Sequence, residues 1–325
     1  MIYICCPAYT ATGGTELLHQ LFFALRKQTR QVRMFYLGVQ DGVHPVAPRF
    51  EKYDVELACQ IEDSVAHCIV MPEVGCAYLR QYTKTKKMIW WLSVDNFYRS
   101  NGIAYPYKIW NIRSIVRLIS RFRWLNNPSI THLAQSHYAK KHLKKYGLVA
   151  EMLSDYLGSD FIAAANNLSS EKKDDVVLYN PLKGVDYTKS LIEAAPSIRF
   201  VPLQGMTPQQ VVETCKKSKV YIDFGNHPGK DRFPREASVL GCVIVTGMRG
   251  SARNDEDIKI PWQYKFHDRK RSIPLIIKQI QNIFGNFEAA QSDFVEYRNR
   301  IMAEESVFLN EINAIWNRIW VHYGQ

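Results

Sequence analysis

The feature that most constrains the fold is an alternation of short apolar runs with amphipathic segments, which occurs in two series along the chain. The first series begins with an apolar run at 2–6, a turn that contains Gly13 and Gly14, and an amphipathic segment from Leu17 onward. Three further apolar runs follow in the same half: 32–37, 68–71 and 88–94. Short apolar runs separated by helical segments are typical of units that build parallel sheets. The pattern therefore predicts an α/β fold with a parallel sheet in this half.

A polar stretch at 166–175 separates the two series. After it, four apolar runs again alternate with helical segments: 176–179, 199–203, 220–224 and 242–246. A chain of 325 residues is long enough for two cores of about 150 residues each. We therefore predict two Rossmann-like domains, followed by a C-terminal helix that either stays with the second domain or crosses back to the first. The predicted boundaries are 1–168, 169–305 and 306–325.

Positive charge is concentrated in the first half of the chain. The formal net charge is +11, and no acidic residue occurs in 96–150. Within this stretch Arg113, Arg117 and Arg121 recur at every fourth position among apolar residues, the pattern of a basic amphipathic helix. Such a helix suits an anionic membrane surface, and a core-packing helix with a solvated cationic stripe is the alternative. We expect 108–145 to supply a membrane contact and expect no nucleic acid partner, because no recognition module accompanies the charge.

The first apolar run is too short for a signal peptide or a membrane span. It holds about five residues before Pro7, whereas a span needs about 20. The seven cysteines show no Cys-x-x-Cys spacing, which favours reduced thiols over a disulfide framework or a zinc site. We therefore expect a cytoplasmic protein, with a peripheral place at the inner face of the membrane if the basic helix binds there.

The most specific motif lies between Pro228 and Thr246. It combines a short loop with Lys230 and Arg232, a helix with Glu236, a glycine and a buried apolar strand. The start of a helix suits phosphate groups because its backbone N–H groups and its dipole favour anions. The alternative is that Glu236 only pairs at the helix end while the two cations are solvated. In its order of elements the motif resembles the donor-site segment of glycosyltransferase family 4, whose retaining GT-B members include enzymes of bacterial capsule, O-antigen or lipopolysaccharide biosynthesis.

The resemblance implies a GT-B fold, in which two Rossmann-like domains face a central cleft and the second domain holds a nucleotide-sugar. Glu236 falls on the second of two family glutamates, which hydrogen-bonds the nucleotide ribose, whereas Pro228 occupies the position of the first. The segments 12–16 and 180–184 are similar to two other donor-site segments of the family. Donor contacts are therefore implied at six residues: Gly13, Gly14, Asn180, His227, Gly229 and Glu236.

The same resemblance implies a retaining transfer in which cationic side chains stabilise the departing nucleotide diphosphate. Lys183, Lys230 and Arg232 are the candidate cations, and Asp95 is a further catalytic candidate. The Asp-Glu-Asp sequence at 255–257 lies in a charged loop after a glycine-rich turn, where carboxylates are usually solvated. We therefore expect no metal and no cofactor, with the nucleotide-sugar acting as a substrate.

Acceptor contacts are expected where strands of the first half end. An apolar run with two tryptophans gives way abruptly to Asp95 and Asn96, and Glu73 follows an earlier apolar run. Carboxylates and amides bind sugar hydroxyls, and aromatic faces pack on sugar rings. A tryptophan-rich core strand followed by a capped turn is the alternative interpretation.

Two functions follow from these patterns. The first is a hexosyltransferase-like, metal-independent enzyme that moves a sugar from a nucleotide-sugar to a saccharide or lipid-linked acceptor, with retention, in surface polysaccharide biosynthesis. The second is a non-catalytic, cation-rich α/β module that binds nucleic acid or an anionic surface, with Pro228 marking lost activity. Hydrolysis of the donor in the absence of an acceptor distinguishes the two functions.

Overall fold

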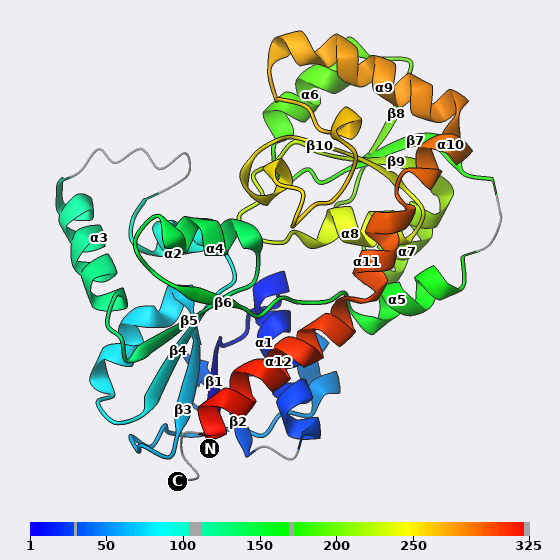
Figure 1. Cartoon of the computed structure of the whole chain (residues 1–325). Helices are drawn as coiled ribbons and strands as arrows, with labels where there is room; N and C mark the ends of the chain where they lie inside the picture. The colour runs from blue at the N-terminus through cyan, green and yellow to red at the C-terminus, as the bar shows by residue number, and fades with distance from the viewer. Residues whose placement is uncertain (29–30, 104–111, 169–171, 322–325) are drawn as a thin grey trace. The chain divides into compact units, whose positions relative to one another are not determined.

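The computed structural model describes residues 1–28, 31–103, 112–168 and 172–321, and the chain divides into two compact units (Figure 1). The first unit is Met1–Asp155 with the part of α12 (Glu304–Val321) from Val307 onward, and the second is Tyr156–Ser306. The division follows Asp155 instead of the polar stretch that the sequence indicated. The reason is α5 (Ser159–Asn166), whose Phe161 is buried in the core of the second unit.

The first unit is built on a parallel six-stranded sheet. Its strands are β1 (Ile2–Pro7), β2 (Val32–Leu37), β3 (Cys68–Pro72), β4 (Lys86–Trp91), β5 (Ile130–Ala134) and β6 (Ala150–Met152). They lie in the order β2-β1-β3-β4-β5-β6. The chain passes from β1 to β2 on one side and then to β3 on the other, so the strand order reverses between β1 and β3. Open α/β sheets bind ligands at such a switch point.

Helices cover both faces of this sheet. They are α1 (Gly13–Lys27), η1 (Pro48–Tyr53), η2 (Glu73–Gln81), α2 (Val94–Ser100), α3 (Ile112–Leu125) and α4 (His137–Lys144), together with α12. The two tryptophans at the end of β4 point to opposite faces, as successive strand residues must. Trp91 packs on Phe97 of α2 with ring centroids 4.7 Å apart, whereas Trp90 stacks on Phe308 of α12. The tryptophan pair is therefore part of the core, in line with the alternative interpretation of this run.

The second unit holds a parallel four-stranded sheet in the order β10-β9-β7-β8. Its strands are β7 (Asp174–Tyr179), β8 (Arg199–Pro202), β9 (Ser218–Asp223) and β10 (Val243–Thr246). The chain leaves β7 for β8 on one side and returns to β9 on the other, so the switch point lies between β7 and β9. The sequence predicted both parallel sheets, and the observed strand pairings confirm them.

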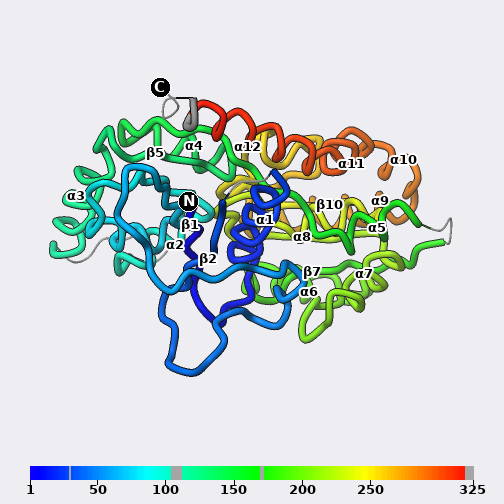
Figure 2. Tube along the Cα trace, turned by 90° about the horizontal axis from the view of Figure 1, so that it is seen from below, coloured from blue at the N-terminus to red at the C-terminus, as the bar shows by residue number. Residues whose placement is uncertain are grey.

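The elements around the second sheet are mostly helical. They are α5, α6 (Val185–Ala194), α7 (Pro208–Lys217), α8 (Arg232–Val239), η3 (Gly250–Arg253), η4 (Trp262–Tyr264), η5 (Lys270–Ser272), α9 (Ile273–Gly285), α10 (Phe287–Ser292) and α11 (Val295–Met302). Figure 2 shows α10, α11 and α12 as successive helical segments. The predicted C-terminal helix corresponds to α12, up to Val321. Within the described ranges, no helix is long and apolar enough to cross a membrane.

Candidate functional site

The second unit gathers most of the predicted site residues at its switch point. The loop 180–184 follows β7 and the loop 224–231 follows β9, and these two strands are hydrogen-bonded neighbours. Each loop leads directly into the start of a helix, α6 after the first and α8 after the second. Backbone N–H groups at a helix start, together with the helix dipole, favour a bound anion. The two loops therefore place two such starts at the edge of the sheet where ligands bind.

Two glycines allow these loops to cross in direct contact. Gly184 has φ +62°, and a Cβ atom built on it would lie 2.4 Å from the carbonyl oxygen of Phe224. A Cβ atom on Gly225 would lie 2.5 Å from the Cβ atom of Lys183. Asn180 shapes the first loop from within, because its side-chain oxygen accepts a hydrogen bond from the backbone N–H of Leu182 at 2.9 Å. The sequence predicted Asn180 as a donor contact, and the structure shows it in this turn.

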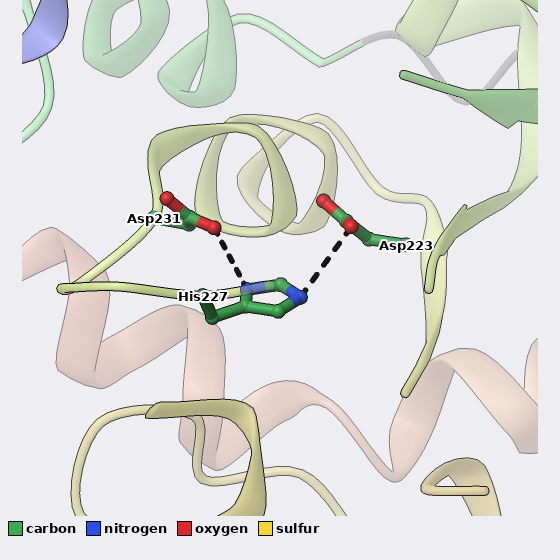
Figure 3. Close-up of side chains that lie close together, drawn as sticks. All are labelled: Asp223, His227 and Asp231. Carbon is green, nitrogen blue, oxygen red and sulfur yellow. Dashed lines mark ion pairs between the residues drawn. The ribbon is translucent and has the colours of Figure 1, made fainter. Parts of the chain in front are cut away.

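A chain of ion pairs connects the two loops, and Figure 3 shows the part of it that Asp223, His227 and Asp231 form. Lys183 Nζ donates to both carboxylate oxygens of Asp231, at 2.9 and 3.0 Å. The other neighbour of Asp231 is His227, whose Nδ1 lies 2.9 Å from Asp231 Oδ2. On the opposite edge of the imidazole, Nε2 lies 3.4 Å from Asp223 Oδ1, at the end of β9. Lys183 is therefore held over the β9 loop by a network that is anchored in the sheet.

The network fixes the charge of its members. Burial disfavours a charged imidazole, but Asp223 and Asp231 outweigh it and raise the pKa of His227 to about 10. Burial likewise opposes ionisation of Asp231, yet Lys183 and His227 lower the pKa of this carboxyl to about 2. At neutral pH His227 is thus an imidazolium and Asp231 a carboxylate. The His227 side chain is fully buried, so we reassign it from direct donor contact to positioning Asp231.

The same three residues are the group, among those described, whose potential metal-ligand atoms lie within 4.8 Å of one another: Asp223, His227 and Asp231. A metal ion requires a neutral imidazole nitrogen with an available lone pair. In the structure both ring nitrogens face carboxylates, and the raised pKa favours the imidazolium, from which a metal ion would have to displace a proton. The three residues form an ion-pair network here, and the absence of a metal from it stays a prediction.

The Asp-Glu-Asp sequence at 255–257 has internal partners. Asp255 accepts hydrogen bonds from Lys265 Nζ at 2.8 Å and from Trp262 Nε1 at 3.0 Å. Asp257 accepts a hydrogen bond from Asn254 Nδ2 at 2.8 Å. These carboxylates stabilise the loop that precedes η4. The absence of a functional metal stays a prediction.

The loop before α8 is held by two residues that the sequence did not single out. Arg235 is fully buried and donates to the backbone carbonyl oxygens of Lys230 and Asp231, at 3.0 and 3.2 Å. Its guanidinium also pairs with Glu304 at 2.6 Å, and the second oxygen of Glu304 lies 2.7 Å from Lys230 Nζ. Glu304 lies about 70 residues farther along the chain, so this contact could not be predicted from the sequence. Arg235 and Glu304 together fix the backbone and the side chain of the loop that carries Lys230.

Gly229 lies in the same loop, and hydrogen bonds from Ser251 of η3 hold this part of the loop in place. Its carbonyl oxygen accepts a hydrogen bond from Ser251 Oγ at 2.6 Å, and the carbonyl oxygen of His227 accepts one from Ser251 N at 2.8 Å. A Cβ atom on Gly250 would lie 1.9 Å from that His227 oxygen, so only glycine fits there. The β9 loop is thus supported along its length.

Glu236 lies in the first turns of α8 and is largely buried. Arg232 Nε lies 3.2 Å from Glu236 Oε1, one helical turn away. This ion pair is the one that the alternative interpretation of the motif described. Arg232 nevertheless begins α8, directly after the loop that carries Lys230, and Glu236 lies one turn farther along the helix. A ribose contact by Glu236 stays a prediction.

In the first unit, the predicted residues also lie at the ends of adjacent strands. Gly13 and Gly14 form the first turn of α1, after β1, because Thr12 and Thr15 form a capping box that begins the helix there. Glu73 follows β3, and Asp95 and Asn96 follow β4 in the first turn of α2. Asn96 is exposed and Asp95 is largely buried. These residues thus follow the carboxyl ends of three neighbouring strands, β1, β3 and β4.

Glu73 is a buried carboxyl that supports the turn after β4. It accepts a hydrogen bond from the backbone N–H of Leu92 at 2.9 Å. Burial raises its pKa to about 7, although the backbone N–H groups of Leu92 and Ser93 favour the ionised form. Glu73 therefore has a positioning role in the turn that leads into α2.

Replacing Glu73 with Gln is expected to change how stability depends on pH. Between about pH 4.5 and 7 the folded protein keeps a proton on Glu73 that the unfolded chain releases, so wild-type stability falls as the pH rises. The variant has no carboxyl group at this position and lacks this loss. The difference between the free energies of unfolding of variant and wild type should therefore shift in favour of the variant by about 1–3 kcal/mol as the pH rises from 4.5 to 7. Urea unfolding at several pH values measures this. Parallel profiles for the two proteins contradict the assigned pKa.

Solved structures resemble this chain over nearly its whole length. Sucrose-phosphate synthase from Thermosynechococcus elongatus superimposes with a TM-score of 0.66 at 12% identity, covering 99% of each chain. HepE from Anabaena, solved with UDP, gives a TM-score of 0.59 at 11% identity over 98% of this chain and 99% of that one. The chain has the GT-B fold. The GT-B glycosyltransferase WaaG, which is involved in lipopolysaccharide biosynthesis, matches with a TM-score of 0.54 at 11% identity over 95% of this chain and 99% of that one.

At these identities the structural likeness establishes the GT-B architecture, as the sequence resemblance implied. No protein-family model matches the sequence, and the comparison with curated proteins finds no match. The assignment of chemistry to this GT-B chain therefore depends on its own residues.

Proposed function

We propose that this chain is a metal-independent, hexosyltransferase-like glycosyltransferase that takes a sugar from a nucleotide-sugar held by its second unit. The observation that carries the proposal is the pair of crossed loops at the switch point between β7 and β9, joined by Lys183 and Asp231. Lys230 and Arg232 lie on the second of these loops and at the start of α8. This combination of fixed cations and helix starts suits a diphosphate.

The proposed donor is a nucleoside diphosphate sugar. Its diphosphate lies at the starts of α6 and α8, and the ribose is held by Glu236. Support for a uridine donor comes from HepE, which shares the fold and was solved with UDP and with UDP-glucose. Because Lys183, Lys230 and Arg232 each have a carboxylate neighbour in this structure, they are oriented before a ligand arrives. Such preorganisation lowers the cost of ordering side chains upon binding.

In the proposed reaction the bond between the sugar and the diphosphate breaks, and negative charge develops on the departing phosphate. Lys183, Lys230 and Arg232 stabilise that charge, which fixed cations do best where water is excluded. The acceptor hydroxyl attacks from the face that the diphosphate leaves, and a phosphate oxygen takes its proton. The anomeric configuration is then retained, as the resemblance to family 4 implies.

The acceptor is proposed to be a saccharide or a lipid-linked saccharide of a surface polysaccharide, bound by the first unit through Asp95 and Asn96. The likeness in fold to WaaG supports this class of acceptor. We place the reaction at the cytoplasmic face of a membrane, with 108–145 as the contacting segment. Lys108 of this segment lies outside the described residues.

The alternative function was a non-catalytic module that binds nucleic acid or an anionic surface. A module of that kind relies on solvated cations that follow a phosphate backbone. In the second unit, by contrast, Lys183 and Lys230 are tied to buried or half-buried carboxylates, in loops shaped by Arg235 and by two crossing glycines. This construction favours one small anion in a defined position.

Replacing Glu236 with Ala tests the donor assignment. We expect UDP affinity to fall by about 1.5–3 kcal/mol, the range for hydrogen bonds that involve a charged group, while the protein stays folded. Titration calorimetry measures the affinity. Glu213→Ala is the matched control, because Glu213 forms a helical ion pair with Lys216 on α7 and lies outside the two loops. Unchanged UDP affinity in folded Glu236→Ala excludes the ribose contact.

A further inference from the structure

Helix α3 has two separate apolar faces. Leu118 and Leu125 are buried in the core of the first unit. Four other aliphatic side chains are exposed to different degrees: Ile112 by 75%, Val116 by 61%, Ile119 by 57% and Ile115 by 39%. The sequence pattern placed these apolar residues on the faces of the helix that the arginine stripe does not occupy, without indicating which of them are buried. The structure shows that none of these four belongs to the buried core of the first unit, although Ile115 is more than half covered.

The exposed residues form one continuous stripe. Their spacing of i, i+3, i+4 and i+7 places them within an arc of about 100°, at 3.6 residues per turn. The buried pair, Leu118 and Leu125, lies on a different side of the helix. Contiguous exposed aliphatic residues of this kind mark a surface for a partner or a membrane.

Positive charge borders the stripe. Arg113 and Arg117 are exposed along one edge, and Arg123 is exposed in the last turn. The whole stretch 96–150 contains no acidic residue, so this part of the sequence is strongly cationic. An apolar stripe bordered by arginines matches a layer whose surface is anionic and whose interior is apolar.

We propose that α3 lies in the interface of an anionic lipid bilayer, with Ile112, Ile115, Val116 and Ile119 inserted among the acyl chains and Arg113 and Arg117 at the phosphate headgroups. The proposal rests on the proposed function only for the choice of membrane, the one that carries the lipid-linked acceptor. Insertion differs from electrostatic docking, in which only the arginines bind. The inserted aliphatic side chains contribute binding that salt does not screen. A nucleic acid could bind the arginines through its phosphates, but its phosphate backbone has no apolar surface on which the four aliphatic side chains could pack.

The test is co-sedimentation of the full chain with vesicles of equal parts phosphatidylglycerol and phosphatidylcholine, compared with vesicles of phosphatidylcholine alone. We expect wild type to bind the anionic vesicles and to keep a measurable part of that binding in 1 M salt, where the Debye length is about 3 Å. The triple variant Ile112→Ser, Val116→Ser and Ile119→Ser should bind at least about tenfold more weakly. Arg113→Glu with Arg117→Glu should weaken binding at low salt.

The matched control removes three exposed valines elsewhere in the first unit: Val43→Ser, Val65→Ser and Val149→Ser. This control should bind vesicles as wild type does. Because the three α3 positions are exposed, the triple α3 variant should fold, and circular dichroism checks this. Its UDP affinity should equal that of wild type, so a failure of vesicle binding and a failure of the transferase proposal give different results.

Two results overturn the insertion proposal. The first is a vesicle-binding result that does not depend on the stripe, either equal binding by the triple α3 variant and wild type or no binding by wild type at all. The other is a wild-type dimer in light scattering that becomes a monomer in the triple variant without any vesicle binding, which assigns the stripe to a second copy of the chain.

Discussion

Gly184→Ala is expected to lower the free energy of unfolding by about 2–5 kcal/mol and to abolish tight UDP binding. The new methyl group would lie 2.4 Å from the Phe224 carbonyl oxygen, in the backbone of the neighbouring loop. Backbone cannot move aside as the end of a flexible side chain can. Left-handed backbone in a residue other than glycine costs about 1–2 kcal/mol, and overpacking costs about 1–3 kcal/mol more. The two loops must separate, which breaks the geometry of Lys183 and Asp231.

Gly205→Ala is the control for this prediction. Gly205 also belongs to the second unit and has φ +67°, but a Cβ atom on it meets nothing within 4 Å. The control therefore carries the backbone strain without the collision. Urea unfolding and UDP titration of both variants separate the two contributions. If Gly184→Ala is no more destabilising than Gly205→Ala and binds UDP equally well, the crossed-loop arrangement is wrong.

Lys183→Ala is expected to reduce kcat/KM for sugar transfer by about 10²–10³-fold, the usual effect of removing one group that stabilises transition-state charge. Asp231 keeps its contact with His227 in this variant, so the protein should fold. Most of the loss should fall on kcat, because charge on the departing diphosphate develops in the transition state. Lys189→Ala, on the exposed side of α6, is the matched control and should be near wild type. Full activity in folded Lys183→Ala removes this lysine from the mechanism.

The two parallel sheets could be predicted because their strands are short apolar runs between helical segments, a signal that local sequence carries. The end of each strand was also visible, which placed Asn180, Lys183 and Glu73 at the correct edges of their sheets. The domain boundary could not be placed in the same way. Local polarity indicated 166–175, whereas burial of Phe161 assigns α5 to the second unit.

The connections within the candidate site depend on contacts between distant positions. Lys183 and Asp231 are 48 residues apart, and Arg235 and Glu304 are 69 apart. No periodicity indicates that a histidine in a polar loop, His227, is fully buried between two carboxylates. The exposure of the α3 stripe could not be predicted for the same reason. A pattern of apolar residues does not indicate which of them pack against a core.

We expect the second unit to bind a nucleoside diphosphate sugar without a metal ion. Calorimetric titration of the full wild-type chain with UDP, GDP, ADP and CDP, in EDTA, tests it most directly. We expect saturable binding of at least one of these nucleotides, with UDP first, and weakened binding in Glu236→Ala. A folded protein that binds none of them contradicts the claim. Binding that vanishes in EDTA and returns with Mn²⁺ or Mg²⁺ contradicts its metal-independent form and makes Asp255 and Asp257 candidate ligands again.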